Sequence, residues 1–418
     1  MTVKYNLDVS TSRPWTLFKL LFRWRGSVWK SVTFELAIWL VLYFSIAAIY
    51  RNRCKYFSKN MQICRAFEKL VHFLDEKLTY IPIDFMLGFF VTSVLNRWLT
   101  FFDNIGYIDK YACHFYFCTI FIHNFPIFFI KYICSVLSHC FNCNERFSIA
   151  LMTAAYVRGN DETSRKMRRN IVRYCVLSQA LVFRDISMKV RKRFPTMNAV
   201  IAAGFMMPHE KLKLDEVQYR YDKYWIPFQW ALAICDDARQ QQKIASDWLH
   251  RKVGEEIKRF RTNMANLYNF DWVPLPIMYP QTIVLAVHLY FFICSISRQH
   301  ILSDEAPNKS KVSTFLMFQN FIFYMGWLKV AEAILNPFGE DDDDFECNFL
   351  LDKNLAVGLT IVDQGYNQPP IIKKDPFWEV PVEPLYTEQS MVLERQMSGI
   401  TGSIAHVKLV HLSFELRF

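Results

Sequence analysis

Four apolar runs, each long enough to cross a bilayer, constrain this chain more than any other feature of its sequence. A transmembrane helix needs about 20 consecutive, mostly apolar residues. The runs occupy residues 32–50, 80–102, 273–296 and 313–335. Aromatic residues make up 17% of the chain, a high share for a soluble domain that agrees with long membrane-embedded segments. The sequence therefore predicts an all-α membrane protein with four transmembrane helices.

Proline and charged residues interrupt the second and third runs. Pro82, Asp84 and Arg97 belong to the second run, and the third contains Pro274, Pro276 and Pro280. Broken and partly polar spans are tolerated where they line a water-filled path rather than face lipid. These interruptions are a first indication of a pore.

The segments between the runs suggest how the chain is oriented. The N-terminal MTVKYNLDVSTSRPW has no apolar core of a signal peptide, so we expect the first run to remain as a span. The basic, helix-periodic region 149–270 is most simply cytosolic, with a competing basic loop at 51–80. A glycosylation sequon at Asn308-Lys309-Ser310 would place the last short loop outside.

A fifth hydrophobic segment, residues 111–147, differs in composition from the rest of the chain. It is rich in Phe, Tyr and Cys, with Pro126 and Lys131 in its middle. It is either a genuine fifth helix or an insertion from a retained intron, and its T-rich codon character favours the insertion. Its single CFNC motif, without a second cysteine pair, argues against a zinc site.

Several motifs resemble the bestrophin family. They are WRGSVWK before the first run, IPIDFMLGFFV in the second, KRFP at 192–195, YDKYWIPFQWA, FYMGWLKVAEAILNPFGEDDDDFE and VDQGYNQPP. The resemblance covers about residues 1–110 and 149–390. An Asn-Pro-Phe-Gly-Glu-Asp run behind a span is its most specific element.

The resemblance implies a pentameric, calcium-activated chloride channel with four spans per subunit and cytosolic termini. It divides the chain into six parts: a cytosolic N-terminal segment (1–31), the first two spans with the pore neck (32–102), the atypical insertion (111–147), a large cytosolic helical domain (149–270), the last two spans (271–335), and a calcium clasp with a cytosolic C-terminal tail (336–418). A complete fifth crossing at 111–147 would separate the N-terminus from the acidic run. Either that segment does not cross the membrane, or the protein is not a working channel.

The acidic run EDDDDFE favours cation binding, because closely spaced carboxylates repel one another unless a cation neutralises them or water solvates them. Ca²⁺ takes about six to eight oxygen ligands, both carboxylates and backbone carbonyls. The resemblance implies that the carboxylates of Asp341 and Asp344 and the carbonyls of Ser10, Ala333 and Asn336 form the calcium clasp. Asn336 precedes Pro337 and should end the last span. The alternative is a solvated acidic cap at a helix N-terminus.

Ile81, Phe85 and Phe89 recur every four residues and form one stripe on a helix face. Such a stripe alone more often faces lipid or core. The resemblance places it in a hydrophobic neck that closes by dewetting, with Trp248 at a second, cytosolic aperture. Asp84 lies off the stripe, and we expect it to pair with a base.

The implied partners are chloride and other small anions, the lipid bilayer and, as a homopentamer, further copies of the chain, in the plasma membrane. A non-conducting scaffold or modulatory subunit is the competing function, favoured by the insertion and the polar tail. An enzyme is not expected, since no phosphate-binding loop, HExxH motif or Ser/His/Asp grouping occurs. Nucleic-acid binding is not expected beside four spans.

Overall fold

The computed structural model describes residues 14–56, 61–78, 80–108, 148–300 and 314–379, and these ranges contain helices and no β-strand. The chain divides into two units, Met1–Tyr366 and Asn367–Phe418. The described helices all lie in the first unit. They are α1 (Pro14–Leu21), α2 (Val28–Tyr56), α3 (Met61–Leu78), α4 (Ile83–Asn104), α7 (Ile149–Tyr156), α8 (Glu162–Ile186), α9 (Met188–Arg193), α10 (Met197–Ala202), α11 (Pro208–Glu216), α12 (Ile226–Gln240), α13 (Asp247–Trp272), α14 (Met278–Ser297), α15 (Thr314–Leu335) and α16 (Cys347–Asp363).

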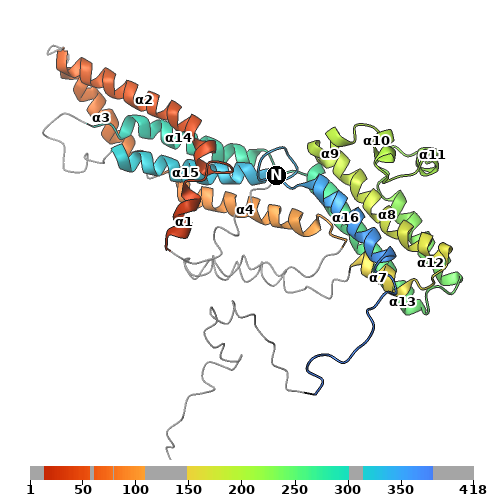
Figure 1. Cartoon of the computed structure of the whole chain (residues 1–418). Helices are drawn as coiled ribbons and strands as arrows, with labels where there is room; N and C mark the ends of the chain where they lie inside the picture. Colours follow the sequence, from red (N-terminus) through yellow and green to blue (C-terminus); the bar gives the residue numbers. More distant parts are fainter. Residues whose placement is uncertain (1–13, 57–60, 79, 109–147, 301–313, 380–418) are drawn as a thin grey trace, which may run out of the picture. The chain divides into compact units, whose positions relative to one another are not determined.

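Helices α2, α3, α4, α14 and α15 lie side by side and share one apolar core (Figure 1). The Trp39 ring of α2 stacks on Phe321 of α15 with their centroids 5.1 Å apart. Its indole nitrogen donates a hydrogen bond to the Phe291 carbonyl of α14 at 2.9 Å. Trp39 therefore joins three helices while leaving no polar atom unsatisfied, as an apolar surrounding requires.

Three helices of the described ranges are long and apolar enough to cross a membrane. They are Val28–Asn52 within α2, Ile83–Asn104 (α4) and Met278–Ser297 (α14). These coincide with the first three predicted runs. Helix α15 covers the fourth run but is not among the three, although its Met317 and Leu328 are buried in the same core. The count of four spans therefore stays a prediction.

The expected loop at 51–80 is mostly helical, which corrects the sequence-based prediction. Helix α2 continues to Tyr56, and α3 then returns alongside α2 and α14 (Figure 1). Val71 and Leu78, seven residues apart on one face of α3, are buried, while charged residues occupy the other faces. This is the pattern of an amphipathic helix. The basic stretch RNRCK that suggested a loop belongs to the last turns of α2.

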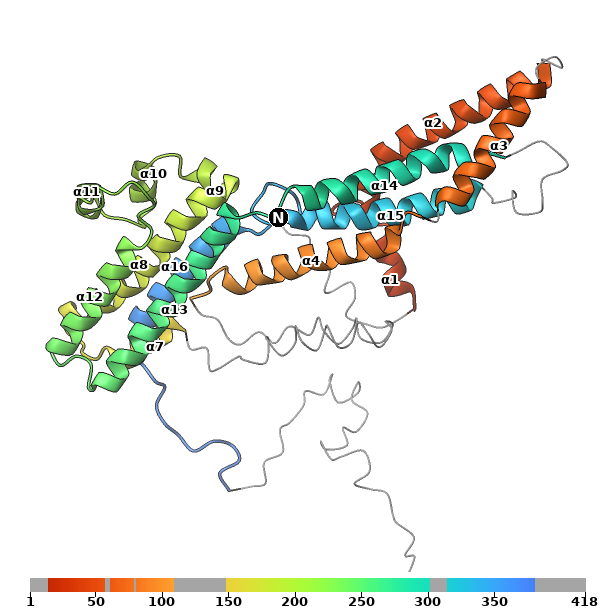
Figure 2. The same ribbon diagram turned by 180° about the vertical axis from the view of Figure 1, so that it is seen from behind.

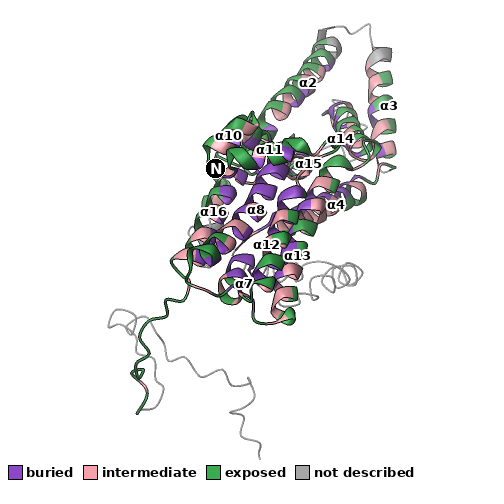
Figure 3. Cartoon of the chain, turned by 90° about the vertical axis from the view of Figure 1, so that its right-hand side faces the viewer, coloured by how far each residue is buried: buried purple, intermediate pink, exposed green. Residues whose placement is uncertain are grey.

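Helix α8 is the centre of a second group, formed by α7–α13 and α16. It packs against α12, α16, α13, α7 and α9, and much of its surface is buried (Figure 3). Its first turn is capped by Asp161, whose carboxylate accepts hydrogen bonds from the backbone and the hydroxyl of Ser164. A hydrogen bond from Lys243, together with the two from Ser164, holds the pKa of Asp161 well below its usual range.

The two groups of helices are joined at the end of α4, which leads towards α13 (Figure 2). There the chain turns through Gly106 at φ +80°, and a Cβ at this position would lie 2.6 Å from Met264. Asn354 of α16 donates to the Gly106 carbonyl and to Gln179 of α8, each at 2.8 Å. Gln179 donates in turn to the carbonyls of Ile105 and Gly106. This buried amide network fixes the exit of α4 onto α8 and α16.

Replacing Asn354 by alanine should lower the free energy of unfolding by about 1–3 kcal/mol, because the buried Gly106 carbonyl and Gln179 each lose a partner. Asn198, which is exposed and accepts a bond from Lys211, provides the matched control Asn198→Ala, which should change little. Thermal unfolding of the detergent-purified variants measures both. Equal stability of the two variants would contradict a structural role for the network.

Candidate calcium site and pore-lining helix

Helix α15 ends at Leu335, as Asn336-Pro337 predicts, and the acidic run follows as a tight loop. The Asn336 carbonyl accepts a hydrogen bond from the Gly339 backbone at 3.3 Å. One Asp344 carboxylate oxygen accepts a bond from the Asp341 backbone N–H at 2.6 Å. A side chain at position 339 would lie 2.9 Å from that oxygen, so glycine allows the close approach. The loop thus brings Asn336, Asp341 and Asp344 together.

The four aspartates of the run lie in different environments. Asp341 and Asp343 are exposed, whereas Asp344 is only 1% exposed. Burial raises the pKa of Asp344 to about 6, and the nearby charges of Asp341 and Asp343 add to this effect. A fully solvated acidic cap therefore does not describe Asp344. Its carboxylate is costly to ionise in this loop unless a cation is near.

Basic residues hold the outer acidic residues of the loop. Asp342 pairs with Lys30 at 3.3 Å and Arg25 at 3.5 Å, and the hydrogen bond from Lys30 lowers its pKa. Glu340 pairs with Lys192 of α9. Lys189 donates to the Asp341 carbonyl at 3.3 Å. The loop is thereby attached to the segment before α2, to the start of α2 itself and to the second group of helices.

A cavity of about 420 Å³ lies between this loop, residues 26–31 and the end of α15. Ala333 and Asp341, two of the predicted calcium ligands, both line it. Ser10, the fifth predicted ligand, lies outside the described residues. Within those residues no group of three or more His, Cys, Asp or Glu side chains is placed to hold a metal. The predicted donors, two carboxylates and three main-chain carbonyls, are of the oxygen type that Ca²⁺ takes and do not require such a group.

Two phenylalanines of the loop pack into what we call the aromatic junction: Trp98 and Phe101 of α4, Phe183 of α8, Phe270 of α13, and Phe338 and Phe345. Phe338 meets Phe101 edge-on with ring centroids 5.4 Å apart, and Phe345 lies 5.3 Å from Trp98. Phe338 also contacts Phe183 and Phe345. The loop is therefore packed directly against the second half of α4.

The predicted neck stripe lies near the start of the same helix. Phe85 is 66% and Phe89 50% exposed, and their ring centroids are 4.6 Å apart. Ile81, just before α4, packs partly against the bundle core. Leu87 and Phe90, on the opposite face of α4, are buried. Phe85 and Phe89 thus do not belong to the core, and they face either lipid or a pore.

The two charged residues of this span find partners within the protein. Asp84 accepts a hydrogen bond from the Tyr324 hydroxyl of α15 at 2.5 Å, so its described partner is a phenol instead of the expected base. Arg97 donates to the carbonyls of Phe270 and Val273 at the end of α13. Its guanidinium also lies 5.2 Å from the Phe101 ring centroid. Arg97 thereby ties α4 to α13.

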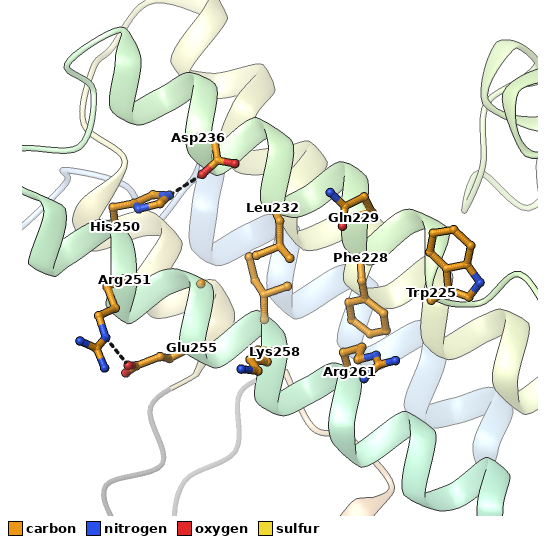
Figure 4. A pocket seen from close by; sticks show the side chains of 12 residues that line it. Trp225, Phe228, Gln229, Leu232, Asp236, His250, Arg251, Glu255, Lys258 and Arg261 are labelled. Atoms are coloured by element: carbon orange, nitrogen blue, oxygen red, sulfur yellow. Dashed lines mark hydrogen bonds and ion pairs between the residues drawn. The ribbon is translucent and has the colours of Figure 1, made fainter.

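Trp248, the predicted aperture residue, lies at the start of α13 and is 61% exposed. The Lys252 ammonium is 5.5 Å from its ring centroid. A larger cavity of about 770 Å³ lies nearby between α12 and α13, where His250 pairs with Asp236 at 2.8 Å (Figure 4). None of the predicted site residues lines this larger cavity. The role of Trp248 at the cytosolic aperture therefore stays a prediction.

Sequence reasoning missed the residues that hold the acidic loop in place. Phe338 and Phe345 lie on either side of the four aspartates. Two bulky apolar side chains in a charged loop indicate that the loop is held in place by packing, and this could have been inferred from the sequence. The pairing of Asp342 with Arg25 and Lys30 joins residues far apart in the sequence. No local pattern indicates such a contact.

Comparisons with known proteins agree with this architecture. A family model described as "Bestrophin, RFP-TM, chloride channel" matches residues 1–126 and 118–364, and the two matches meet inside the atypical segment 111–147. That segment lies outside the described residues. Bestrophin homolog 24 of Caenorhabditis elegans is 49% identical over 420 residues, covering 100% of this chain and 59% of that protein. Bestrophin homolog 18 of the same organism is 45% identical, covering 98% of this chain and 80% of that protein.

A solved structure shares the fold. The crystal structure of a bacterial bestrophin homolog from Klebsiella pneumoniae superimposes with a TM-score of 0.52 over 78% of this chain and 98% of that chain, at 13% identity. The present chain spans 59% of the length of homolog 24. The family match over most of the chain and the identity to these relatives confirm the resemblance seen in the motifs: the chain belongs to the bestrophin family.

Proposed function

We propose that this protein is a calcium-activated chloride channel of the plasma membrane, assembled as a homopentamer. Family membership supports anion conduction, since the matching family model is described as a chloride channel. Calcium dependence and the pore rest on the arrangement of this chain's own residues. No enzymatic activity is part of the proposal.

The packing of the acidic loop against α4 carries the proposal. Phe338 and Phe345 extend from the loop that would hold calcium into the aromatic junction, where they meet Trp98 and Phe101. The same helix carries Phe85 and Phe89 about two and a half to four and a half turns earlier. Because packed aromatic side chains transmit displacement and do not absorb it, a shift of the loop is expected to move α4. The ion site and the neck then belong to one mechanical unit.

Phe85 and Phe89 would form the gate. They face away from their own subunit's core, so a single chain cannot enclose a pore with them, and in a channel the stripe would repeat around an axis. A ring of such side chains closes by expelling water. When it opens, the positive edges of the phenyl rings can lie beside a partly dehydrated anion without binding it tightly. Gly88 leaves space beside the rings, since a Cβ there would touch nothing within 4 Å.

The chain's oxygen atoms would hold the calcium ion at the loop. Asp341 and Asp344 supply carboxylates, and Ala333 and Asn336 supply the carbonyls that α15 leaves without helical partners at its end. Ser10 would add a carbonyl from the N-terminal segment. A bound divalent cation offsets the repulsion among these carboxylates and keeps the loop folded as one piece.

Loss of either proposed carboxylate should raise the calcium concentration for half-maximal current by about tenfold or more, because affinity at such sites follows the number of charged ligands. Patch recordings of Asp341→Ala and Asp344→Ala over a range of internal calcium test this. Asp343→Ala removes the same charge from the same loop and should shift the curve much less.

Calcium-activated currents that keep their calcium dependence in both variants would rule out the clasp. A protein that binds calcium and partner proteins in pull-downs but conducts no anions would favour the scaffold function instead. These two results are separable, because the first leaves conduction intact.

The calcium-free protein should be stabilised by removing the buried charge. The pKa of Asp344 is raised to about 6 in the fold from about 3.8 in the unfolded chain. Its stability contribution is therefore most favourable below the unfolded value and is lost as the pH rises through about 6. With about 1.4 kcal/mol for each pKa unit, Asp344→Asn should gain at most about 3 kcal/mol at neutral pH in chelator, and the gain should shrink towards pH 4.

The asparagine oxygen can still accept the bond from the Asp341 backbone, so the substitution changes charge more than geometry. Thermal unfolding of wild type and Asp344→Asn across this pH range measures the effect. Asp215→Asn, an exposed aspartate of α11, is the control. A wild type that is more stable than Asp344→Asn at neutral pH without calcium would contradict the raised pKa.

A further inference from the structure

Residues 18–30, which we call the N-terminal collar, run from the end of α1 to the first turn of α2 and expose large apolar side chains. Phe22 is 87% exposed, Trp24 60% and Phe18 50%. Leu21 and Trp29 are exposed as well. Among the described helices, α1 packs extensively against none. Water is a poor surrounding for so much contiguous apolar surface, which indicates a binding face.

The collar is also strongly basic. It contains Lys19, Arg23, Arg25 and Lys30 and no acidic residue. Each basic residue of the stretch directly follows or precedes an aromatic residue in the sequence. Basic residues interleaved with Trp and Phe are typical of segments that lie in the headgroup region of a membrane.

The collar continues directly into a candidate span. Helix α2 begins at Val28, and its window Val28–Asn52 meets the criteria for crossing a membrane. The Trp29 indole donates to the Leu21 carbonyl at 2.7 Å, which holds the end of α1 against the start of α2. Phe34 and Ile38 of α2 are exposed along the same helix. The collar therefore lies at the level where a bilayer meets water.

Charge complementarity indicates which kind of molecule binds the N-terminal collar. The collar of a second copy, placed against this one, would bring the same four basic residues and no acidic one. Phosphatidylserine and other anionic phospholipids supply both an acyl region for the rings and a negative headgroup for the cations. A neutral bilayer supplies only the first.

We propose that the N-terminal collar binds anionic phospholipid headgroups at the membrane surface, with its aromatic rings inserted beside them. Arg25 and Lys30 contribute to the same surface while they pair with Asp342, next to the proposed ligand Asp341. The collar thus connects the lipid surface with the acidic loop. This binding does not depend on anion conduction or on calcium.

The test uses the full-length protein in nanodiscs of phosphatidylcholine with a minor fraction of phosphatidylserine. After extraction, mass spectrometry measures the ratio of the two lipids retained on the protein. Wild type should retain phosphatidylserine above its share of the bilayer. Lys19→Gln and Arg23→Gln should each lower that enrichment by about fivefold, the loss expected for one basic residue near an anionic surface. Added salt should lower it further.

The matched control removes two exposed lysines outside the collar, Lys373→Gln with Lys374→Gln, and should leave the enrichment unchanged. The variant Phe22→Ala with Trp24→Ala keeps every charge and should still lower retention, because the rings hold the collar at the headgroups. Unchanged unfolding temperatures would exclude misfolding as the cause. Retention in proportion to the bilayer, or an equal loss in the Lys373/Lys374 control, would overturn the proposal.

Discussion

The packing of two phenylalanines behind an acidic loop is the interaction on which the rest of this structure depends. Phe338 and Phe345 place the carboxylates next to the end of α15 and, in the same contacts, against the second half of α4. An acidic loop without them would be held by the hydrogen bond from Lys189 and by exposed ion pairs, each of which contributes about 1 kcal/mol or less. The aromatic junction therefore couples the position of the loop to α4, the span that carries the predicted neck.

Side-chain hydrogen bonds to backbone carbonyls also hold α4 in place. Arg97 takes the carbonyls at the end of α13, and Asn354 and Gln179 take those at the exit of α4. Each of these contacts restricts the movement of α4 relative to the second group of helices, α7–α13 and α16. Buried, satisfied networks of this kind favour one arrangement over many. The helices that share the apolar core (α2, α3, α4, α14 and α15) and the second group of helices are in this way coupled through α4.

Much of the architecture was predictable from the sequence, because long apolar runs and an Asn-Pro helix end have local causes. The first three runs coincide with α2, α4 and α14, and α15 ends where Pro337 requires. Helix α3 was missed because six charged residues are interspersed among its apolar ones, which made the segment look like a polar loop. The partners of Asp84 and Asp342 depend on which helices become neighbours. The predicted ligands Ala333, Asn336, Asp341 and Asp344 lie around one loop, whereas the calcium they would bind, the neck and the aperture remain predictions.

The coupling between the acidic loop and α4 is tested most directly by a variant of the aromatic junction in which calcium binding and channel opening are measured separately. Phe345→Ala removes a ring that contacts Trp98 without removing any proposed ligand. Calcium binding to the purified protein and calcium-activated current should be measured on the same variant, with the exposed Phe349→Ala as its control. We expect Phe345→Ala still to bind calcium while its current is largely lost, and Phe349→Ala to keep both. Full calcium-activated current in Phe345→Ala would contradict coupling through the aromatic junction.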